Sequence, residues 1–292
     1  RLGGVPVWVD VDPHQFIIDL ADAARKVSPR TRAIMPVHLF GQSCDLVALQ
    51  AFASAHRIRI VEDAAQSMGA RWQGRSTMSV GDLGTTSFFP SKNLGGMGDS
   101  GLVTTSDDAL ADRARIFRVH GMQPKYYHRE VGANFRMDPL QAALLHLKLP
   151  HLPEYNCARA GNANFYHAAL KGQAGIAENR PGVEATAKIL LPVDFSGQGI
   201  WNQFTLRVTG GRRDALKAFL TARKIGCEIY YPIPLHRQEC FASAGYRGGD
   251  SVPVSELLST EVLSIPIFPE LSVEQRQWVA DSLADFAAGK NE

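Results

Sequence analysis

The sequence predicts an α/β fold, with a mostly parallel central sheet flanked by helices and a smaller α+β domain after it. Three strand-like apolar runs alternate with two helical segments between residues 5 and 63. This order is typical of parallel sheets, because a helix returns the chain to the edge where the next strand begins. Beyond about residue 150, short strands and helices follow in a less regular order, which favours a separate α+β domain.

Apolar spacing defines the expected elements of the first part of the chain. Runs rich in β-branched and aromatic residues predict strands, and apolar residues repeating every three to four positions predict helices. Ser106 is the expected N-cap of one helix. The expected elements are strand 5–11, helix 19–26, strand 32–40, helix 45–56, strand 57–63, strands 84–89 and 101–105, helix 107–119 and helix 138–149.

Pro150 and Pro153 mark the expected domain boundary, because proline removes a helical hydrogen bond and clashes with the preceding turn. We expect a large domain over residues 1–150 and a small domain over residues 151–292. The small domain would contain a linking helix from about Glu154, strands 201–208, 226–231 and 262–267, helix 212–224 and a last helix from Ser272. Because the chain opens almost directly on strand 5–11, we expect a preceding segment to be absent.

The composition favours a globular protein without a nucleic-acid or membrane partner. The 292 residues include 31 basic and 29 acidic side chains, spread without blocks, and no apolar run is long enough to span a bilayer. The four cysteines lie far apart and form no C-x-x-C pair, which favours reduced thiols in the cytoplasm over disulfides or zinc. Motifs of metal hydrolases and serine hydrolases are absent, so we expect no metal.

Lys92 and Asp63 are the main candidates for chemistry. Lys92 follows Phe88, Phe89 and Pro90, an apolar approach expected to lower the pKa of its amine by desolvation. Such an amine can hold a carbonyl cofactor as a Schiff base, and an aspartate at the end of a buried strand can keep a ring nitrogen protonated. Together they indicate a pyridoxal phosphate site. The alternatives are a solvated surface lysine and an aspartate that caps the segment after its strand.

Two further polar side chains fit the same cofactor. Gln66, three residues after Asp63, could hydrogen-bond the phenolic oxygen of the cofactor ring. Ser87, five residues before Lys92, could donate its hydroxyl to a phosphate oxygen. Both residues lie on the segments that contain the aspartate and the lysine.

The glycines between residues 96 and 101 match the fingerprint G-x-G-x-x-G, which leaves a nucleotide-dependent oxidoreductase as an alternative. That fingerprint should follow a strand and open a helix. Here it follows the loop of Lys92 and precedes the strand-like residues 101–105. A closely packed turn is therefore the favoured interpretation.

Seven segments of the chain resemble the motifs of the DegT/StrS family of sugar aminotransferases. They follow in the family's order, and the similarity runs from the first expected strand to the last helix. The segments are EDAAQS (62–67), SFFPSK (87–92), VHG (119–121), YYH (126–128), GANFRMD (132–138), YPIPLH (231–236) and LSIPIFP (263–269). The resemblance implies a fold-type-I transferase that uses pyridoxal phosphate.

The resemblance also implies roles for single residues of one subunit. Lys92 matches the Schiff-base lysine, which moves a proton between substrate and cofactor, and Asp63 matches the partner of the ring nitrogen. Gln66 matches the residue beside the ring hydroxyl, and Ser87 matches a phosphate ligand. Together with Asn134, these are the expected cofactor-binding residues.

Two residues are implied to act across a subunit boundary. Asn134 matches an asparagine that reaches the cofactor phosphate of the neighbouring subunit. His236 matches a residue near the sugar substrate, often contributed by the partner. The resemblance therefore implies a homodimer with shared active sites.

The implied activity is transfer of an amino group from a donor such as glutamate to a nucleotide-linked keto-sugar, in polysaccharide or secondary-metabolite biosynthesis. Family dehydratases have histidine at the position of Lys92, so the lysine favours transamination. A non-catalytic or regulatory member of the same fold is the alternative. It is considered because the family's Gly-Thr phosphate loop, at a helix N-terminus ahead of the first strand, has no match here.

Overall fold

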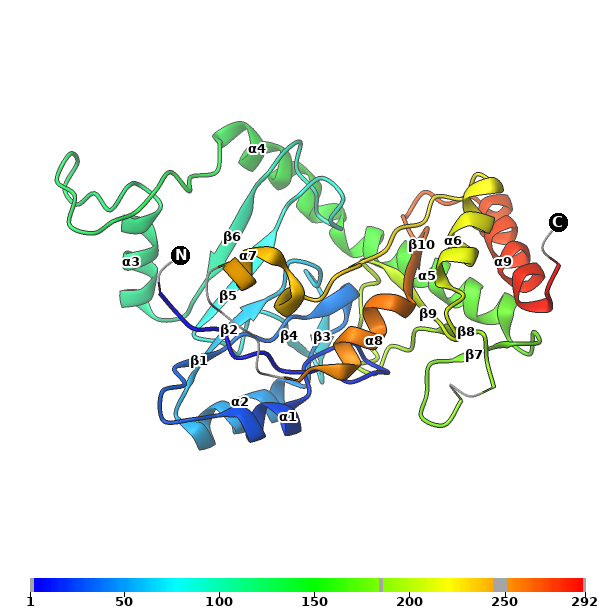
Figure 1. Cartoon of the computed structure of the whole chain (residues 1–292). Coiled ribbons are helices and arrows are strands. Elements are labelled where there is room, and N and C mark those ends of the chain that lie inside the picture. The colour runs from blue at the N-terminus through cyan, green and yellow to red at the C-terminus, as the bar shows by residue number, and fades with distance from the viewer. Residues whose placement is uncertain (1–2, 184–185, 244–250, 291–292) are drawn as a thin grey trace. The chain divides into compact units, whose positions relative to one another are not determined.

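The computed structural model of the chain describes residues 3–183, 186–243 and 251–290 (Figure 1). The chain forms two compact units. The lysine unit, named for Lys92, comprises Thr31–Asn156 and Gln198–Ile200. The C-terminal unit comprises Arg1–Arg30, Cys157–Gly197 and Trp201–Glu292.

The expected domain boundary at residue 150 stays a prediction. The two compact units divide the chain at other positions. Arg1–Arg30, expected in the large domain, belong to the C-terminal unit. The other change of unit falls inside helix α5 (Leu152–Leu170), between Asn156 and Cys157. Contacts between residues far apart in the sequence therefore decide how the compact units are grouped.

The lysine unit is built on a four-stranded sheet with the order β1-β2-β5-β6. Its strands are β1 (Ala33–Ile34), β2 (Arg59–Asp63), β5 (Leu83–Ser87) and β6 (Gly101–Thr104). β1 and β5 both pair parallel with β2, whereas β6 is antiparallel to β5. The carboxyl ends of the three parallel strands lie at one edge, which is where ligands bind in sheets of this kind.

Short helices and a hairpin complete the lysine unit. They are η1 (Leu39–Gly41), α2 (Leu46–His56), β3 (Arg71–Trp72), β4 (Arg75–Ser76), α3 (Asp108–Phe117), α4 (Pro139–Lys148) and η2 (Leu149–His151). Helix α2 packs against β2 and buries Leu46, Leu49 and Ala53, which follow the three-to-four spacing of an apolar helix face. The predicted helix 45–56 is therefore confirmed, with Asp45 as its N-cap.

The expected helix break at Pro150 and Pro153 is short. Helix α4 passes through the single turn η2, which contains Pro150, directly into α5. Pro153 lies in the first turn of α5, where a missing N–H costs no intrahelical hydrogen bond.

The predicted N-cap of α3 is wrong by one residue. Asp107, and not Ser106, caps the helix, because its carboxylate accepts the N–H groups of Ala109 and Leu110 at 2.8 and 3.1 Å. These bonds satisfy two donors that the first helical turn leaves without a partner.

The C-terminal unit contains a second sheet, with the order β10-β9-β8-β7. β9 is antiparallel to β8 and to β10, and β7 is parallel to β8. The elements are α1 (Leu20–Lys26), β7 (Ile176–Glu178), β8 (Ile189–Leu191), β9 (Phe204–Val208), α6 (Arg213–Ala222), η3 (Leu235–Arg237), α7 (Glu239–Ser243), α8 (Pro253–Glu261), β10 (Val262–Ile265), α9 (Val273–Ala288) and most of α5. A core of apolar residues from the sheet, α5, α6 and α9 includes the fully buried Phe204, Leu216, Leu220 and Leu283.

Strand 5–11 was predicted wrongly. Only Val11 makes a bridge, with Ile18. The N–H of Asp10 donates to the carboxylate of Asp22 at 2.7 Å, and that of Val11 donates to Asp10 at 3.0 Å. These backbone donors are satisfied by side chains instead of a neighbouring strand, and Pro6 has no donor at all.

Strand 226–231 was also predicted wrongly, and strand 32–40 is shorter than expected. Residue Glu228 exchanges two backbone hydrogen bonds with Ser264, at 2.8 and 3.0 Å, but the pairing extends no further. In the earlier segment only β1 is a regular strand, followed by a bridge between Val37 and Asp63.

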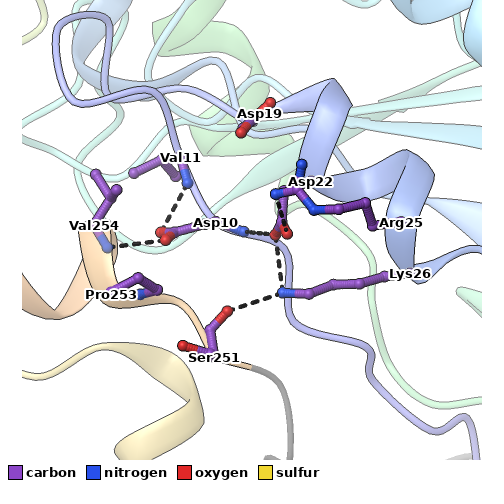
Figure 2. Close-up of a pocket in the computed structure, with 9 residues that line it drawn as sticks. All are labelled: Asp10, Val11, Asp19, Asp22, Arg25, Lys26, Ser251, Pro253 and Val254. Carbon is purple, nitrogen blue, oxygen red and sulfur yellow. Dashed lines mark hydrogen bonds and ion pairs between the residues drawn. The ribbon is translucent and has the colours of Figure 1, made fainter.

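A polar cavity of about 510 Å³ lies in the C-terminal unit (Figure 2). Asp10 accepts the N–H groups of Val254 and Ser255 at the start of α8, at 2.9 and 2.8 Å. Asp22 accepts the amine of Lys26 at 2.9 Å and the N–H of Asp10. The carboxylates of Asp10 and Asp22 therefore connect α1, α8 and the segment around residue 10. The cavity is a structural junction, and none of the expected site residues lines it.

The core of the C-terminal unit yields a stability prediction. Replacement of Leu220 by Ala should lower the free energy of unfolding by ~2–5 kcal/mol, because the fully buried side chain leaves a cavity on α6. The matched control, Leu257→Ala on α8, removes a side chain that is 46% exposed and should cost less than about 1 kcal/mol. Urea unfolding curves measure both changes. Equal losses would contradict this description of the core.

Candidate active site

Asp63 is the last residue of β2, at the carboxyl edge of the parallel strands. Its backbone N–H donates to the carbonyl of Pro36 at 2.9 Å, and its carbonyl accepts the N–H of His38 at 2.9 Å. Its carboxylate accepts the N–H of Ala65 at 3.0 Å. The capping role that the sequence left open is therefore present, and it holds the carboxylate at the sheet edge.

The residue before Asp63 is a fully buried carboxylate. Glu62 accepts a hydrogen bond from the Nε2 atom of His38 at 2.9 Å, and bonds from the N–H groups of Met78, Val80 and Gly81 at 2.9, 2.9 and 2.6 Å. Burial alone would raise the pKa of Glu62, but the bonds from His38, Gly81 and Val80 lower it below its usual value. Glu62 is thus an ionised group inside the unit.

The loop that contains Lys92 is fixed at both ends by apolar packing. Phe88 and Leu94, which flank the lysine, are buried in a cluster with Leu145 of α4 and Leu152 of α5. Within the loop, the N–H of Lys92 donates to the carbonyl of Phe89 at 2.9 Å. The position of the lysine backbone therefore depends on packing against two helices.

Glycine is required at the end of this loop. A side chain at Gly95 would place its Cβ 2.3 Å from the carbonyl oxygen of Pro90, so only glycine allows the loop to fold back on itself. Fewer apolar side chains shield the lysine loop than the sequence predicts, because Phe88 is buried but Phe89 and Pro90 are exposed.

The amine of Lys92 is half-buried, in contrast to a solvated surface lysine. Burial lowers its pKa, and the negative charge of Asp63 opposes this shift in part. The two charges are therefore close enough to interact across the sheet edge. A desolvated amine can add to the carbonyl carbon of a cofactor, and a nearby carboxylate can pair with a basic ring nitrogen. Lys92 and Asp63 therefore fit pyridoxal phosphate.

Gln66 and Ser87 lie at the same edge of the sheet. The Oε1 atom of buried Gln66 accepts a hydrogen bond from the N–H of Phe40 at 2.8 Å. This bond fixes the orientation of the amide group, because it determines which end carries the oxygen and which the NH₂. Ser87 is the last residue of β5, and its Oγ atom accepts the N–H of Phe89 at 3.1 Å. A serine hydroxyl that accepts one bond retains its own hydrogen for donation.

Two of the expected site residues, Asn134 and His236, contact residues that have no expected role at the site. Asn134 is exposed, and its Oδ1 atom lies 3.4 Å from the N–H of Arg136. His236 belongs to the C-terminal unit, where its Nε2 atom lies 2.8 Å from the carboxylate of Glu256. Their expected roles stay predictions.

A pair of amides next to the lysine was missed by the sequence analysis. The Nδ2 atom of Asn93 donates to Asn156 at 2.6 Å and to the carbonyl of Ile200 at 3.0 Å. Asn156 in turn donates to the carbonyl of Met68 at 3.3 Å. The pair connects the lysine loop to the segment after Asp63, and only the side chain of Asn93, adjacent to the lysine, could have indicated it.

The glycines of the G-x-G-x-x-G match lead into the strand β6, and no helix follows them. The chain bends at residues 97–99, and the interpretation as a closely packed turn stays a prediction. A dinucleotide fingerprint needs a helix N-terminus for the phosphates, so the oxidoreductase alternative loses its structural basis.

The DegT/DnrJ/EryC1/StrS aminotransferase family matches residues 1–284 of the chain. The chain belongs to this family. It is an aminotransferase that uses pyridoxal phosphate, with the α/β fold of fold type I that the resemblance implied.

Two curated relatives illustrate the similarity. The chain is 42% identical to a pleiotropic regulatory protein of Geobacillus stearothermophilus, over 98% of this chain and 73% of the relative. It is 40% identical to UDP-N-acetyl-3-dehydro-α-D-glucosamine 3-aminotransferase of Acidithiobacillus ferrooxidans, over 94% of this chain and 69% of the relative.

Solved structures of the same kind show the same fold. DesV of Streptomyces venezuelae is 38% identical, with a TM-score of 0.86 over 97% of this chain and 72% of DesV. NtdA of Bacillus subtilis, solved with its cofactor PMP, is 27% identical, with a TM-score of 0.85 over 98% of this chain and 63% of NtdA.

The described part of the chain contains neither a helix that could span a membrane nor a cluster of metal-ligating side chains. In residues 3–183, 186–243 and 251–290, no helix is long and apolar enough to cross a membrane. In the same residues, no group of three His, Cys, Asp or Glu side chains is placed to hold a metal ion.

The environment of Lys92 predicts an unusually reactive amine in the cofactor-free aminotransferase. Because burial lowers its pKa, Lys92 should react with an acylating reagent at a lower pH than the exposed Lys171 does. Asp63→Asn should move the reaction of Lys92 to still lower pH, since the carboxylate raises the lysine pKa. Mass spectrometry of peptides labelled across a pH series measures both effects. A shift to higher pH in the variant would contradict the assigned interaction.

Proposed function

We propose that this aminotransferase transfers an amino group from a donor such as glutamate to a nucleotide-linked keto-sugar. The half-buried amine of Lys92 beside the carboxylate of Asp63 is the observation on which the chemistry rests. The sugar class is supported by the relatives, which include an aminotransferase named for a UDP-linked dehydro-glucosamine and others named for dTDP-linked amino sugars. The product would serve polysaccharide or secondary-metabolite biosynthesis.

Lys92 and Asp63 divide the chemical work of the proposed reaction. When bound, pyridoxal phosphate would supply an electron sink and a carbonyl group for the amino group. The Nζ atom of Lys92 would hold the cofactor covalently, and as a free amine it would accept the proton from the substrate carbon that bears the amino group. Its lowered pKa makes the neutral, proton-accepting amine more abundant. The carboxylate of Asp63 would keep the ring nitrogen protonated.

Three polar side chains are proposed to orient the cofactor. The amide of Gln66, fixed by its bond to Phe40, faces the ring hydroxyl. The hydroxyl of Ser87 donates to the phosphate, and Asn134 reaches the phosphate of the neighbouring subunit. In this proposal His236 lies near the sugar, with Glu256 holding its imidazole ring in place.

We infer a homodimer with shared active sites from the exposed apolar side chains of the lysine unit. Large apolar side chains of the lysine unit are left exposed, among them Met97, Val131, Phe135 and Leu140 at 72% to 97%. Val131 and Phe135 lie on the same segment as Asn134. Exposed apolar side chains of this number are typical of a surface that another protein covers.

A cytoplasmic location is proposed from the cysteines. Cys44, Cys157, Cys227 and Cys240 are all free thiols in the structure. Free thiols are typical of reducing compartments.

A regulatory role is the second candidate function, since one of the relatives bears the name of a pleiotropic regulatory protein. A purely regulatory protein could keep the fold and the cofactor site without turning over a donor. Conversion of the bound cofactor to its amine form by glutamate alone would favour the aminotransferase.

Lys92→Ala tests the proposed function directly. The variant should lose the visible absorption band of the bound cofactor and should show no detectable transfer from glutamate to a panel of nucleotide-linked keto-sugars, because the covalent link and the proton acceptor are both removed. Absorption spectra and product chromatography measure the two effects. Lys171→Ala, at an exposed position, is the control and should behave as wild type. Full turnover by Lys92→Ala would refute the assigned chemistry.

Mixing two inactive variants tests the shared site. Lys92→Ala and Asn134→Asp dimers should each be inactive, the second because a carboxylate would repel the cofactor phosphate. After exchange of subunits, a hybrid dimer contains one site with both native residues, and about a quarter of wild-type activity per site should return. The measurement is turnover after mild dissociation and reassociation. If both residues serve the same chain, no activity will return.

A further inference from the structure

His38 and Glu62 form a buried polar pair that the proposed chemistry does not use. Both side chains are fully buried, and the Nε2 atom of His38 lies 2.9 Å from the carboxylate of Glu62. The N–H of Cys44 donates to the other ring nitrogen at 3.0 Å. Because Nδ1 accepts this bond, the ring proton is on Nε2 and is donated to Glu62.

We propose that the pair of His38 and Glu62 is a positioning device for Asp63, which fixes the end of β2 so that the carboxylate of Asp63 meets the cofactor ring nitrogen. The inference rests on the proposed role of Asp63. Glu62 would not touch the cofactor, because the side chains of β2 alternate between its faces, and His38 is fully buried against Glu62. Ile60 and Glu62 are buried on one face of the strand, whereas Asp63 belongs to the other face.

The first support is the double connection between His38 and the end of β2. The backbone N–H of His38 donates to the carbonyl of Asp63, while its side chain donates to Glu62. The N–H of Asp63 donates to Pro36, two residues before the histidine. Residues 36–38 therefore hold residues 62–63 by three hydrogen bonds, although this segment extends beyond the regular strand β1.

The second support comes from the opposite side of β2. Three backbone N–H groups in the turn before β5 donate to the carboxylate of Glu62. The hydroxyl of Thr85 donates to the carbonyl of Glu62 at 3.1 Å, and the N–H of Ala64 donates to the carbonyl of Thr85 at 2.8 Å. Asp63 thus lies between two residues whose backbones are held by β5.

A role limited to stability is the competing explanation. Burial of a carboxylate and an imidazole has a desolvation cost, and well-packed apolar residues often replace such pairs without loss of stability. A directional polar pair differs from an apolar one because its hydrogen bonds fix relative position as well as proximity. The two explanations differ in whether cofactor affinity changes beyond the change in stability.

The test compares Glu62→Gln with Glu261→Gln in the cofactor-free protein. Both substitutions change a buried carboxylate to an amide. Glu261 pairs with Arg207 in the C-terminal unit and has no bond to the segments around Asp63. The dissociation constant of pyridoxal phosphate, measured by fluorescence titration, and the melting temperature are recorded for each variant. Asp63→Asn is measured alongside.

We expect Glu62→Gln to raise the dissociation constant of the cofactor by about ten-fold or more. Glu261→Gln should change it by less than about two-fold at a similar loss of melting temperature. Turnover of Glu62→Gln with saturating cofactor should show a lower kcat with a nearly unchanged KM for the donor, because the weakened contact is at the ring nitrogen and not at the substrate.

A second pair of variants decides the case if Glu62→Gln does not fold. His38→Gln keeps an N–H donor for Glu62, and His38→Leu removes it. Higher cofactor affinity in His38→Gln than in His38→Leu would support the positioning role.

Equal effects of Glu62→Gln and Glu261→Gln on cofactor affinity would overturn the inference, as would equal affinities of the two His38 variants. If Asp63→Asn itself leaves the affinity and the absorption band unchanged, the proposed role of Asp63 fails. That outcome is separate from a failure of the positioning pair, in which Asp63→Asn has its effect and Glu62→Gln does not.

Discussion

The carboxylate of Glu62 is the group on which the arrangement of the site depends. It is fully buried, and a buried charge is tolerated only when nearby donors replace the water it has lost. Here four donors do so, one from His38 and three from the turn before β5. Two segments that are separate in the sequence are thereby fixed around the end of β2. The candidate cofactor carboxylate, Asp63, is the next residue.

The other half of the site is held by different forces. Lys92 sits on a loop whose flanking residues, Phe88 and Leu94, are buried in an apolar cluster. Asn93 and Asn156 add directional bonds that reach the carbonyl of Met68, in the segment after Asp63. Apolar packing determines how near the loop lies, and the amide pair determines its orientation. The lysine amine is left half-buried, with a lowered pKa and a negative charge nearby.

The regular elements could be predicted from the sequence where their partners are local or repetitive. Helix α9 shows this well, because Ser272 and Gln275 form a capping box that depends only on residues three positions apart. The pattern of residues 5–11 could not show that they form no strand. The N–H of Asp10 donates to the side chain of Asp22, and the carboxylate of Asp10 accepts an N–H at the start of α8. Contacts between residues 244 positions apart leave no trace in local spacing.

The same distinction applies to the site. Asp63 and Lys92 were predictable because each residue type is suited to one part of the cofactor chemistry. His38 was visible only as a lone histidine within an apolar run. Its contact with Glu62 spans 24 residues and depends on which strands are neighbours. Supporting residues of this kind are defined by the fold, so they become visible only when the sheet order is known.

Two consecutive carboxylates at the end of β2 therefore have opposite surroundings. Glu62 points into the unit and is surrounded by four donors, whereas Asp63 points to the sheet edge and acts on Lys92. Because side chains of a strand alternate between its faces, a shift of β2 by one residue would move each side chain to the opposite face. The shift that brings Asp63 to the position of Glu62 would leave the four donors facing a shorter side chain, and it would put Ala64 at the position of Asp63. The bonds to Glu62 thus oppose a change of register and select the single arrangement in which Asp63 and Lys92 face each other.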